Sequence, residues 1–405
     1  MQNHRSRILI SLVLLLFTSF AHAADTQEKE WNLLIYLNGV NSLDQFAPIN
    51  LKQMETVGST DKLNILVQWG SESNPNTERL LVQKSTDATK ITSPVVQNMG
   101  NVDMGDWHQV VNFVDWAHQN YPAKKYFVVI WDHGGGWHLP YQPDLQKRQD
   151  RMHPNDISWD DKTGHFIKTE ELGQAMAAVA KIIGHKVNIY GSDACLMGMI
   201  EVAAQMSDSV NYYVGSQETE PGDGWPYSTF LSKWTAQIDT LSDAGVATLL
   251  SKEYKAAYSA GGIYDSTAVT MAAYDLSQTA QYEQSLKQLN DSLIRVPPAS
   301  IAKIQASANA TKSFTYGDYK DVVDFTNQLA KNGFQNDSAL QAVQTAQSKF
   351  VISNDQNTDT VTNGVSIWLP TEDYDYTGNS DRYQGLKFQQ DTGWGELVKA
   401  IQAKQ

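Results

Sequence analysis

The chain has 405 residues, a formal net charge of −14 at pH 7, an apolar fraction of 41% and a charged fraction of 19%. This composition is ordinary for a globular protein, and the length predicts one large domain or two of medium size. The negative charge argues against nucleic acid or an anionic membrane as a partner.

The N-terminus has the parts of a secretory signal peptide. Arg5 and Arg7 precede an apolar segment at 8–20, and an Ala-His-Ala site follows at 21–23. A basic region, a short apolar core and a small-residue cleavage site are typical of such signals. We therefore expect cleavage after Ala23 and export to the bacterial periplasm or the medium. No later segment is long enough to span a bilayer, so no membrane anchor is expected after cleavage.

Short apolar runs alternate with amphipathic segments in residues 24–240. Buried strands are expected at 31–37, 63–69, 126–131 and 187–190, with a more exposed strand at 78–83. Helices are expected at 42–57, with an interruption near Pro48, and at 107–118 and 169–183. Residues 85–100 are turn-rich, and residues 138–165 have the composition of a long exposed loop. All-apolar strands joined by helices predict an α/β core with a mainly parallel central sheet.

From residue 241 onward the sequence becomes richer in helical patterns. Helices are expected at about 241–259, 276–294, 318–331 and 337–350, and strands at 267–273 and 364–369. No repeat or low-complexity linker separates this region from the preceding one. We therefore expect a helix-rich region at 241–405 that packs on the 24–240 core, with some strands completing or covering that core.

Cys195 is the only cysteine in the chain. It follows an apolar strand and a Gly-Ser-Asp turn signal, and a segment with helical spacing comes after it. This pattern places the thiol beyond the carboxyl end of a strand, where open α/β sheets carry their active sites. It also predicts a helix N-terminus at the thiol, which favours a thiolate. A small, buried and inert thiol is the alternative.

Export bears on the role of Cys195. An exported chain with one cysteine forms no intramolecular disulfide, and its odd thiol is either intermolecular or reactive. A metal site built on several cysteines is excluded for the same reason. The single thiol is therefore a candidate nucleophile.

A second chemical stretch, DHGGGWH at 132–138, directly follows the strand expected at 126–131. Three glycines allow the backbone to approach a ligand closely, and their amides are suitable donors to an oxyanion. An esterase oxyanion element would have this appearance, but it requires a G-x-S-x-G elbow, which the sequence lacks.

Two other functions compete for the same stretch. Metal binding by His133 and His138 with Asp132 or Asp160 is disfavoured because the histidine spacing fits no helical ligand pair and H-E-x-x-H is absent. A Cys–His dyad requires only that neighbouring parallel strands bring His133 and Cys195 together. A structural glycine turn with a bystander histidine is the non-functional alternative.

Several stretches resemble the clostripain-like cysteine peptidases, which belong to the caspase-like grouping. These are WDHGGGW (131–137), SDACLMGMIEVA (192–203) and SQETEPGDGWPY (216–227), with weaker matches at YGDYKDVVDF (316–325) and GVSIWLP (364–370). The resemblance implies a caspase-like fold and a catalytic dyad of His133 and Cys195. It also implies an oxyanion hole formed by the amides of Gly134 and Cys195.

The resemblance further implies that Asp193 lies at the base of the S1 pocket and selects Arg or Lys before the scissile bond. A carboxylate beside a thiol raises the thiol pKa, so Asp193 suits cation binding better than activation of Cys195. A turn or helix-cap role is the alternative. Glu218, Glu220 and Asp223 follow the next strand, and they either line the same rim or form a solvated acidic loop.

Self-processing within the 138–165 loop is also suggested by the family, with Lys147, Arg148 and Arg151 as the candidate sites. Calcium dependence is known among such peptidases, but no EF-hand pattern is present and no ligands are assigned. No other cofactor and no metal site are expected.

The sequence thus predicts an exported cysteine endopeptidase that cleaves peptide or protein substrates after Arg or Lys. The rival is a catalytically silent exported peptide-binding protein that keeps the caspase-like fold. The joint presence of His133, Asp193 and Cys195 favours the peptidase. Asp132 is a poor candidate for a third catalytic residue, because neighbours on a strand point to opposite faces.

Overall fold

A computed structural model describes residues 27–138, 156–357 and 361–402. The expected signal peptide and the candidate processing sites Lys147, Arg148 and Arg151 lie outside the described residues. Among the helices of the described segments, none combines the length and hydrophobicity that a bilayer span requires.

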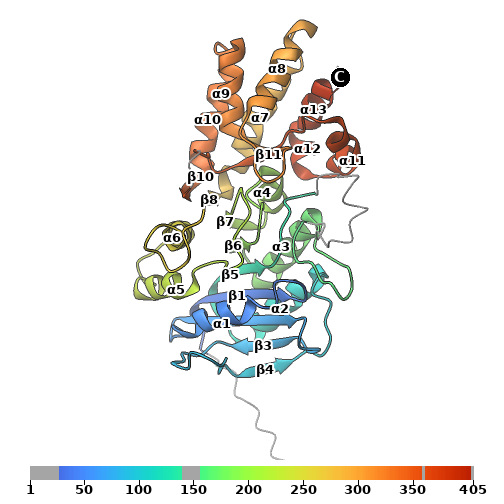
Figure 1. Ribbon diagram of the computed structural model, residues 1–405. Helices are drawn as coiled ribbons and strands as arrows, with labels where there is room; N and C mark the ends of the chain where they lie inside the picture. The colour runs from blue at the N-terminus through green and yellow to red at the C-terminus, as the bar shows by residue number, and fades with distance from the viewer. Residues whose placement is uncertain (1–26, 139–155, 358–360, 403–405) are drawn as a thin grey trace, which may run out of the picture.

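The described residues form a central nine-stranded sheet in the order β10-β8-β7-β6-β5-β1-β2-β3-β4 (Figure 1). Its strands are β1 (Lys29–Gly39), β2 (Leu63–Ser71), β3 (Glu78–Leu81), β4 (Val95–Asn98), β5 (Ala123–Trp131), β6 (Val187–Asp193), β7 (Val210–Gly215), β8 (Val269–Asp275) and β10 (Val351–Asn357). The central strands from β7 to β2 are parallel, and the outer strands join antiparallel at both edges. The expected α/β fold with a mainly parallel centre is confirmed.

The central strands carry long apolar runs because both faces of the sheet are covered. In β1, Trp31, Leu33 and Ile35 enter the core on one face. Leu34 and Tyr36 enter the core on the other face. A strand buried on both sides reads as a continuous apolar run, which is why the sequence identified these strands.

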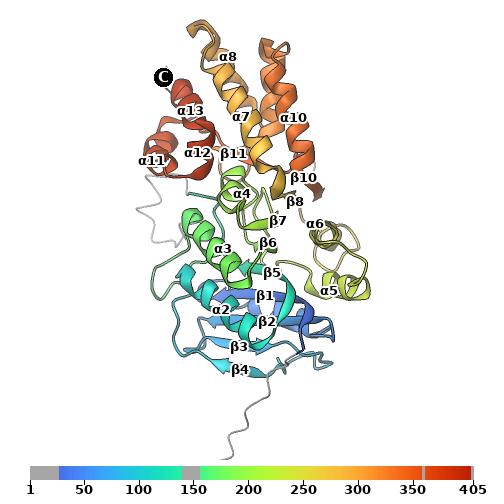
Figure 2. The ribbon, with the colours of Figure 1, turned by 180° about the vertical axis from the view of Figure 1, so that it is seen from behind.

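Helices cover the two faces (Figures 1 and 2). One face is covered by α2 (Trp107–Asn120), α3 (Thr169–Ile183) and α4 (Ile200–Met206), and the other by α1 (Ala47–Glu55), α5 (Tyr227–Ala236) and α6 (Asp243–Ala257). The bounds of α3 equal the predicted 169–183. The interruption predicted near Pro48 has a simple basis, because this proline lies in the first turn of α1 and the preceding residues form turns.

The second half of the chain extends the molecule beyond the β10 edge of the sheet (Figures 1 and 2). Its further helices are η2 (Leu276–Gln278), α7 (Thr279–Leu293), α8 (Pro298–Ala310), α9 (Val322–Leu329), η3 (Ala330–Phe334), α10 (Ser338–Phe350), α11 (Asp373–Tyr383), α12 (Lys387–Thr392) and α13 (Trp394–Gln402). A small second sheet pairs β9 (Tyr319–Asp321) with β11 (Ser366–Trp368). The buried side chains of these helices are continuous with the α2–α4 side of the core.

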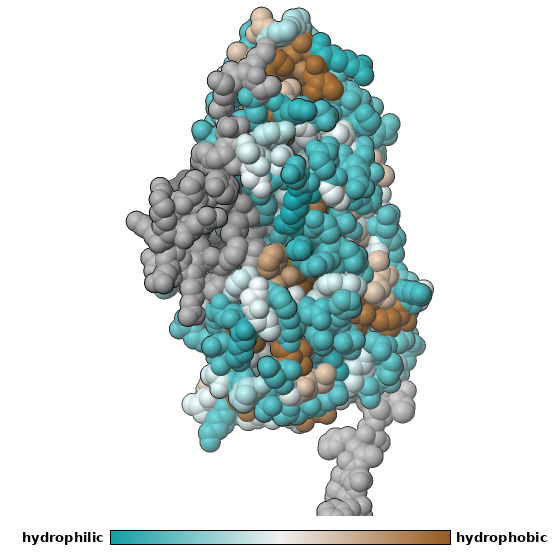
Figure 3. All heavy atoms as spheres, turned by 90° about the vertical axis from the view of Figure 1, so that its right-hand side faces the viewer, coloured by the Kyte–Doolittle hydropathy of each residue, from teal (hydrophilic) through white to brown (hydrophobic). Residues whose placement is uncertain are grey.

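Hydrophilic residues cover most of the surface in the view of Figure 3, and hydrophobic residues gather there only in separate small patches. The large exposed apolar side chains come from different parts of the chain: Ile49, Val95, Ile263, Ile294 and Val361. Single exposed apolar side chains are normal on globular proteins.

The register of two neighbouring strands brings the two chemical stretches to one edge of the sheet. Trp131 at the end of β5 pairs with Asp193 at the end of β6. His133 lies two residues after Trp131, and Cys195 lies two residues after Asp193. Because parallel strands end at the same edge, the histidine and the thiol leave the sheet side by side.

Candidate active site

The ends of β5 and β6 border a cavity of about 230 Å³. His133, Asp193 and Cys195 all line it, together with Glu220, Pro221, Gly222 and Gly224 of the loop that follows β7. The structure therefore brings three of the predicted site residues into one cavity.

A tight turn presents Cys195. The next residue, Leu196, has a φ of 63°, in the left-handed region that residues with a side chain rarely adopt. The Leu196 amide donates to the Glu218 carbonyl over 3.1 Å, and the Gly198 amide donates to the Ser216 carbonyl over 2.6 Å. Strain of this kind costs about 1–3 kcal/mol and persists only where the surrounding contacts impose it.

The prediction that Cys195 lies at a helix N-terminus is wrong. Helix α4 begins at Ile200, five residues after the cysteine. The apolar residues of the intervening turn have helix-like spacing, but they are buried by contacts with other segments of the chain. Met199, for example, forms a β-bridge with Ser366 of the second half of the chain. The amides of a helix N-terminus therefore do not explain how this thiol ionises.

The sulfur of Cys195 instead contacts the loop after β7. It accepts a hydrogen bond from the Glu220 amide over 3.2 Å. Burial raises the pKa of the Cys195 thiol to about 12, and the charges of Glu220 and Glu218 act in the same direction, whereas the Glu220 amide opposes them. The thiol in this conformation is protonated at neutral pH.

His133 contacts a serine that the sequence did not single out. The hydroxyl oxygen of Ser42 lies 2.9 Å from Nε2 of His133. The neighbouring Asn41 and the nearby Asn38 donate to the Asp132 carboxylate over 2.6 and 2.9 Å. Burial raises the pKa of Asp132 well above its ordinary value. The turn after β1 thus contacts both His133 and the residue before it.

Gly134 lies directly against the backbone of Cys195. A Cβ atom at Gly134 would lie 2.4 Å from the Cys195 carbonyl oxygen and 3.1 Å from its amide nitrogen. A side chain at this position would therefore push the two segments apart. Among the described residues, no backbone carbonyl or side-chain carboxylate accepts a hydrogen bond from either amide. Both amides are available to a ligand oxygen.

Asp193 is 4% exposed and lines the cavity from the end of β6. Its Oδ2 atom accepts from the Tyr227 hydroxyl over 2.8 Å and from the Trp225 amide over 3.3 Å. Gly224, at a φ of 64°, keeps space open beside this carboxylate, because a Cβ there would lie 3.2 Å from Oδ1. Asp193 therefore has one carboxylate oxygen held by the protein and the other facing the space beside Gly224.

Glu220 supplies a second carboxyl group beside Asp193. Burial raises the pKa of Asp193 to about 7. Burial and the charge of Asp193 raise the pKa of Glu220 well above its ordinary value. Two neighbouring carboxyl groups in such surroundings retain a proton unless a cation joins them.

The three acidic residues of the loop after β7 differ in their surroundings. Glu220 lines the cavity. The Glu218 carboxylate turns to the second half of the chain and accepts from the Thr315 amide over 3.1 Å. Asp223 contributes its backbone carbonyl, which accepts from the Asn50 side chain. Only Glu220 of the three thus shares the cavity with Asp193.

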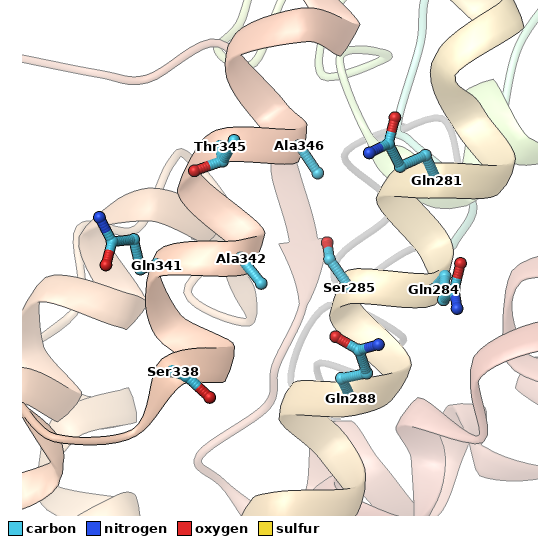
Figure 4. A pocket seen from close by; sticks show the side chains of 9 residues that line it. All are labelled: Gln281, Gln284, Ser285, Gln288, Ser338, Gln341, Ala342, Thr345 and Ala346. Carbon is cyan, nitrogen blue, oxygen red and sulfur yellow. The ribbon is translucent and has the colours of Figure 1, made fainter.

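A larger cavity of about 430 Å³ lies between α7 and α10 (Figure 4). Its lining consists of amide, hydroxyl and alanine side chains: Gln281, Gln284, Ser285, Gln288, Ser338, Gln341, Ala342, Thr345 and Ala346. It contains no acid, no base and no thiol, so a hydroxyl there has no partner to activate it. Of these two cavities, only the one at the strand ends has acids, a base and a thiol in its lining.

The two histidines that the sequence offered as metal ligands face different neighbours. His133 contacts Ser42, and His138 forms a buried pair with Asp318 over 2.9 Å. Across residues 27–138, 156–357 and 361–402, no cluster of three or more histidine, cysteine or acidic side chains is arranged to bind a metal ion.

Fold and site together define a class of protein. A mainly parallel sheet with a histidine and a thiol at adjacent strand ends is typical of cysteine-type peptidases with a caspase-like fold. The sequence model of the Clostripain family matches residues 35–400, and the chain belongs to this family of cysteine peptidases. Clostripain of Hathewaya histolytica is 25% identical over 324 residues, which cover 68% of this chain and 59% of that protein. The chain thus spans less than two thirds of the length of this curated relative.

Solved structures show that the fold is shared. A secreted C11 cysteine protease from Bacteroides thetaiotaomicron, in complex with an irreversible peptide inhibitor, has a TM-score of 0.67 at 20% identity and covers 90% of this chain and 99% of its own. An inactive zymogen of a C11 protease from Parabacteroides distasonis has a TM-score of 0.65 at 18% identity, with the same coverage. The caspase-like fold expected from the sequence is confirmed.

Proposed function

We propose that the protein is an exported cysteine endopeptidase that cleaves peptide or protein substrates after arginine or lysine. The observation that carries the proposal is a single cavity that contains the Cys195 thiol, the His133 imidazole and the Asp193 carboxylate. Family membership supports the class of chemistry, and the acidic cavity supports the choice of substrate.

Cys195 acts as the nucleophile and His133 as the acid–base group. The thiol proton passes to His133, and the sulfur attacks the carbonyl carbon of the scissile bond. His133 then gives this proton to the leaving amine, and water hydrolyses the resulting thioester with His133 as the base. Because the thiol is protonated in the free protein, its ionisation accompanies substrate binding. The Ser42 hydroxyl holds the imidazole in one orientation through Nε2.

The amides of Gly134 and Cys195 bind the oxyanion of the tetrahedral intermediate. The close contact between Gly134 and the Cys195 backbone brings the two donors to one place. Amides fixed in this way stabilise a developing negative charge without reorganising.

The carboxyl pair of Asp193 and Glu220 recognises a basic side chain. A guanidinium or ammonium group takes the place of the retained proton and forms charge-assisted hydrogen bonds. Tyr227 and Trp225 hold Oδ2 of Asp193, so the carboxylate keeps its position when the cation binds. A neutral side chain would leave two carboxyl groups without a partner cation, which disfavours its binding.

Export is supported by the basic, apolar and Ala-x-Ala pattern of residues 1–23. Self-processing at Lys147, Arg148 or Arg151 is part of the proposal and concerns residues outside the described segments. The chemistry needs no cofactor. Calcium dependence stays a prediction from the resemblance.

Hydrolysis of fluorogenic peptides that differ only in the residue before the scissile bond tests the proposal. Arginine, lysine, alanine and aspartate are compared in the presence of calcium and a reductant, before and after nicking of the 138–165 loop. We expect release from the arginine or lysine peptide at least about 100-fold faster than from the other two. Binding of the basic peptides without release would support the silent binding protein instead. Intact-mass measurement of active enzyme completes the test, because an unbroken chain from Ala24 would exclude a requirement for loop cleavage.

A further inference from the structure

A tyrosine from the second half of the chain is hydrogen-bonded to the loop that follows His133. Tyr319 is the first residue of β9 and is fully buried. Its hydroxyl oxygen lies 2.6 Å from the carbonyl oxygens of both Gly135 and His138, and its single hydrogen is shared between these two acceptors. The same oxygen accepts from the His138 amide over 3.2 Å. One hydroxyl group therefore closes the turn that begins directly after Gly134.

The glycine run allows this contact. Gly136 has a φ of 73°, and a Cβ atom there would lie 2.6 Å from the Tyr319 hydroxyl oxygen. The same Cβ would lie 2.5 Å from the sulfur of Met199, which belongs to the turn after Cys195. The loop thus rests on Tyr319 on one side and on the cysteine turn on the other.

The neighbouring residues of the loop are also held from the second half of the chain. Arg382 of α11 donates to the Trp137 carbonyl and forms a two-point ion pair with Asp156. His138 is paired with Asp318, the residue before Tyr319. These contacts hold the loop through residues that do not line the cavity, and within the described segments no backbone carbonyl accepts from the Gly134 amide.

We propose that Tyr319 is a positioning residue for the peptidase reaction: its hydroxyl fixes the Gly135–His138 turn so that the Gly134 amide points at the oxyanion. The inference rests on the proposed function. It also gives the second half of the chain a part in catalysis, since residues 318–382 hold the loop that the catalytic core supplies. A shift of about 1 Å in a group that acts on the transition state costs about 100-fold in rate.

Tyr319→Phe tests the proposal because it removes only the hydroxyl group. Tyr274→Phe is the matched control, since Tyr274 is equally buried and its hydroxyl donates to the Gly364 carbonyl over 2.6 Å outside the cavity. For the arginine peptide we expect Tyr319→Phe to lower kcat by about 100-fold with KM within about twofold, because the lost interaction acts in the transition state. Alkylation of Cys195 by iodoacetamide should stay at the wild-type rate, because alkylation forms no oxyanion. Tyr274→Phe should keep kcat.

Two results would overturn the proposal. One is a kcat of Tyr319→Phe within about threefold of the control. The other is a parallel loss of kcat, alkylation rate and thermal midpoint, which would show that the hydroxyl only supports folding. Absence of cleavage of any peptide by the wild-type enzyme would instead refute the proposed function, and the inference would fall with it.

Discussion

The backbone amide of Glu220 donates a hydrogen bond to the sulfur of Cys195 across 3.2 Å, and the side chain of the same residue faces Asp193 in the acidic part of the cavity. One residue therefore contacts the proposed nucleophile through its backbone and the proposed specificity site through its carboxyl group. An ionised Glu220 raises the pKa of the Cys195 thiol, and a cation bound beside the two carboxyl groups offsets that charge. Recognition of the basic side chain and ionisation of the thiol are coupled in this arrangement.

Glu220→Gln should separate these two effects. At a pH high enough to ionise Glu220 in the wild type, loss of its charge lowers the thiol pKa, so alkylation of Cys195 by iodoacetamide should become about threefold faster or more. At pH values where Glu220 keeps its proton, the alkylation rate should not change. At the same time kcat/KM for the arginine peptide should fall, because one of the two acceptors for the cation is lost. Slower alkylation in the variant would contradict the coupling.

Asp193→Asn should remove the preference for basic residues. If the buried carboxylate accepts the substrate cation as proposed, kcat/KM for arginine and lysine peptides should fall about 100-fold. The alanine peptide should be affected far less. Asp223→Asn is the control, since Asp223 lies on the same side of the cavity but does not line it. Equal losses for the basic and alanine peptides would show that Asp193 is not part of the S1 pocket.

The preference for basic peptides should depend on pH. Because burial raises the pKa of Asp193 to about 7, the carboxyl group of the free enzyme is increasingly protonated below that pH. A cation must then displace a proton, so the ratio of kcat/KM for arginine to that for alanine should fall by up to about tenfold per pH unit below 7. Use of the ratio cancels any pH dependence of the catalytic steps that both peptides share. A ratio that stays constant from pH 5 to pH 8 would contradict this assignment.

Glu201 allows a test of stability away from the cavity. Its Oε1 atom accepts from the Trp368 amide over 2.9 Å and from the Tyr383 hydroxyl over 3.1 Å. Burial raises its pKa to about 7, above the value near 4.5 of the unfolded chain. The stability that this group contributes is therefore complete below about pH 4.5 and is lost as the pH rises toward 7.

Glu201→Gln should remove this pH dependence. The difference in unfolding free energy between the variant and the wild type should shift in favour of the variant by up to about 3 kcal/mol between pH 4 and pH 7. Denaturant unfolding of both proteins at the two pH values measures this shift. A difference in unfolding free energy that does not change with pH would contradict a raised pKa at Glu201.

Local patterns made the central strands and helices predictable. The apolar run of β1 and the acidic first turn of α3, with Gly184 in the left-handed region at its end, are visible in the sequence. β10 was not predicted. Most of its residues are polar and all are half-buried, and its place in the sheet depends on backbone pairing with β8. Such an edge strand carries no hydrophobic alternation for a pattern to detect.

The same contrast applies to the site. His133 and Cys195 follow buried strands, so their place at the sheet edge follows from strand order alone. The contacts of Ser42, Glu220 and Tyr319 join segments far apart in the chain, and Tyr319 is 184 residues from its partner Gly135. No local pattern records such pairs, because they arise only when the chain folds, and the Tyr319 contact also requires the second half of the chain to pack against the core.

The central claim is that Cys195 attacks peptides whose preceding residue is basic. Reaction with a peptidyl arginyl chloromethyl ketone, followed by peptide mapping in a mass spectrometer, tests it most directly. The predicted result is one adduct, on the sulfur of Cys195, that forms much faster than with the alanyl analogue and is slowed by excess arginine peptide. An adduct on another residue, or equal rates for the arginyl and alanyl reagents, would contradict the claim.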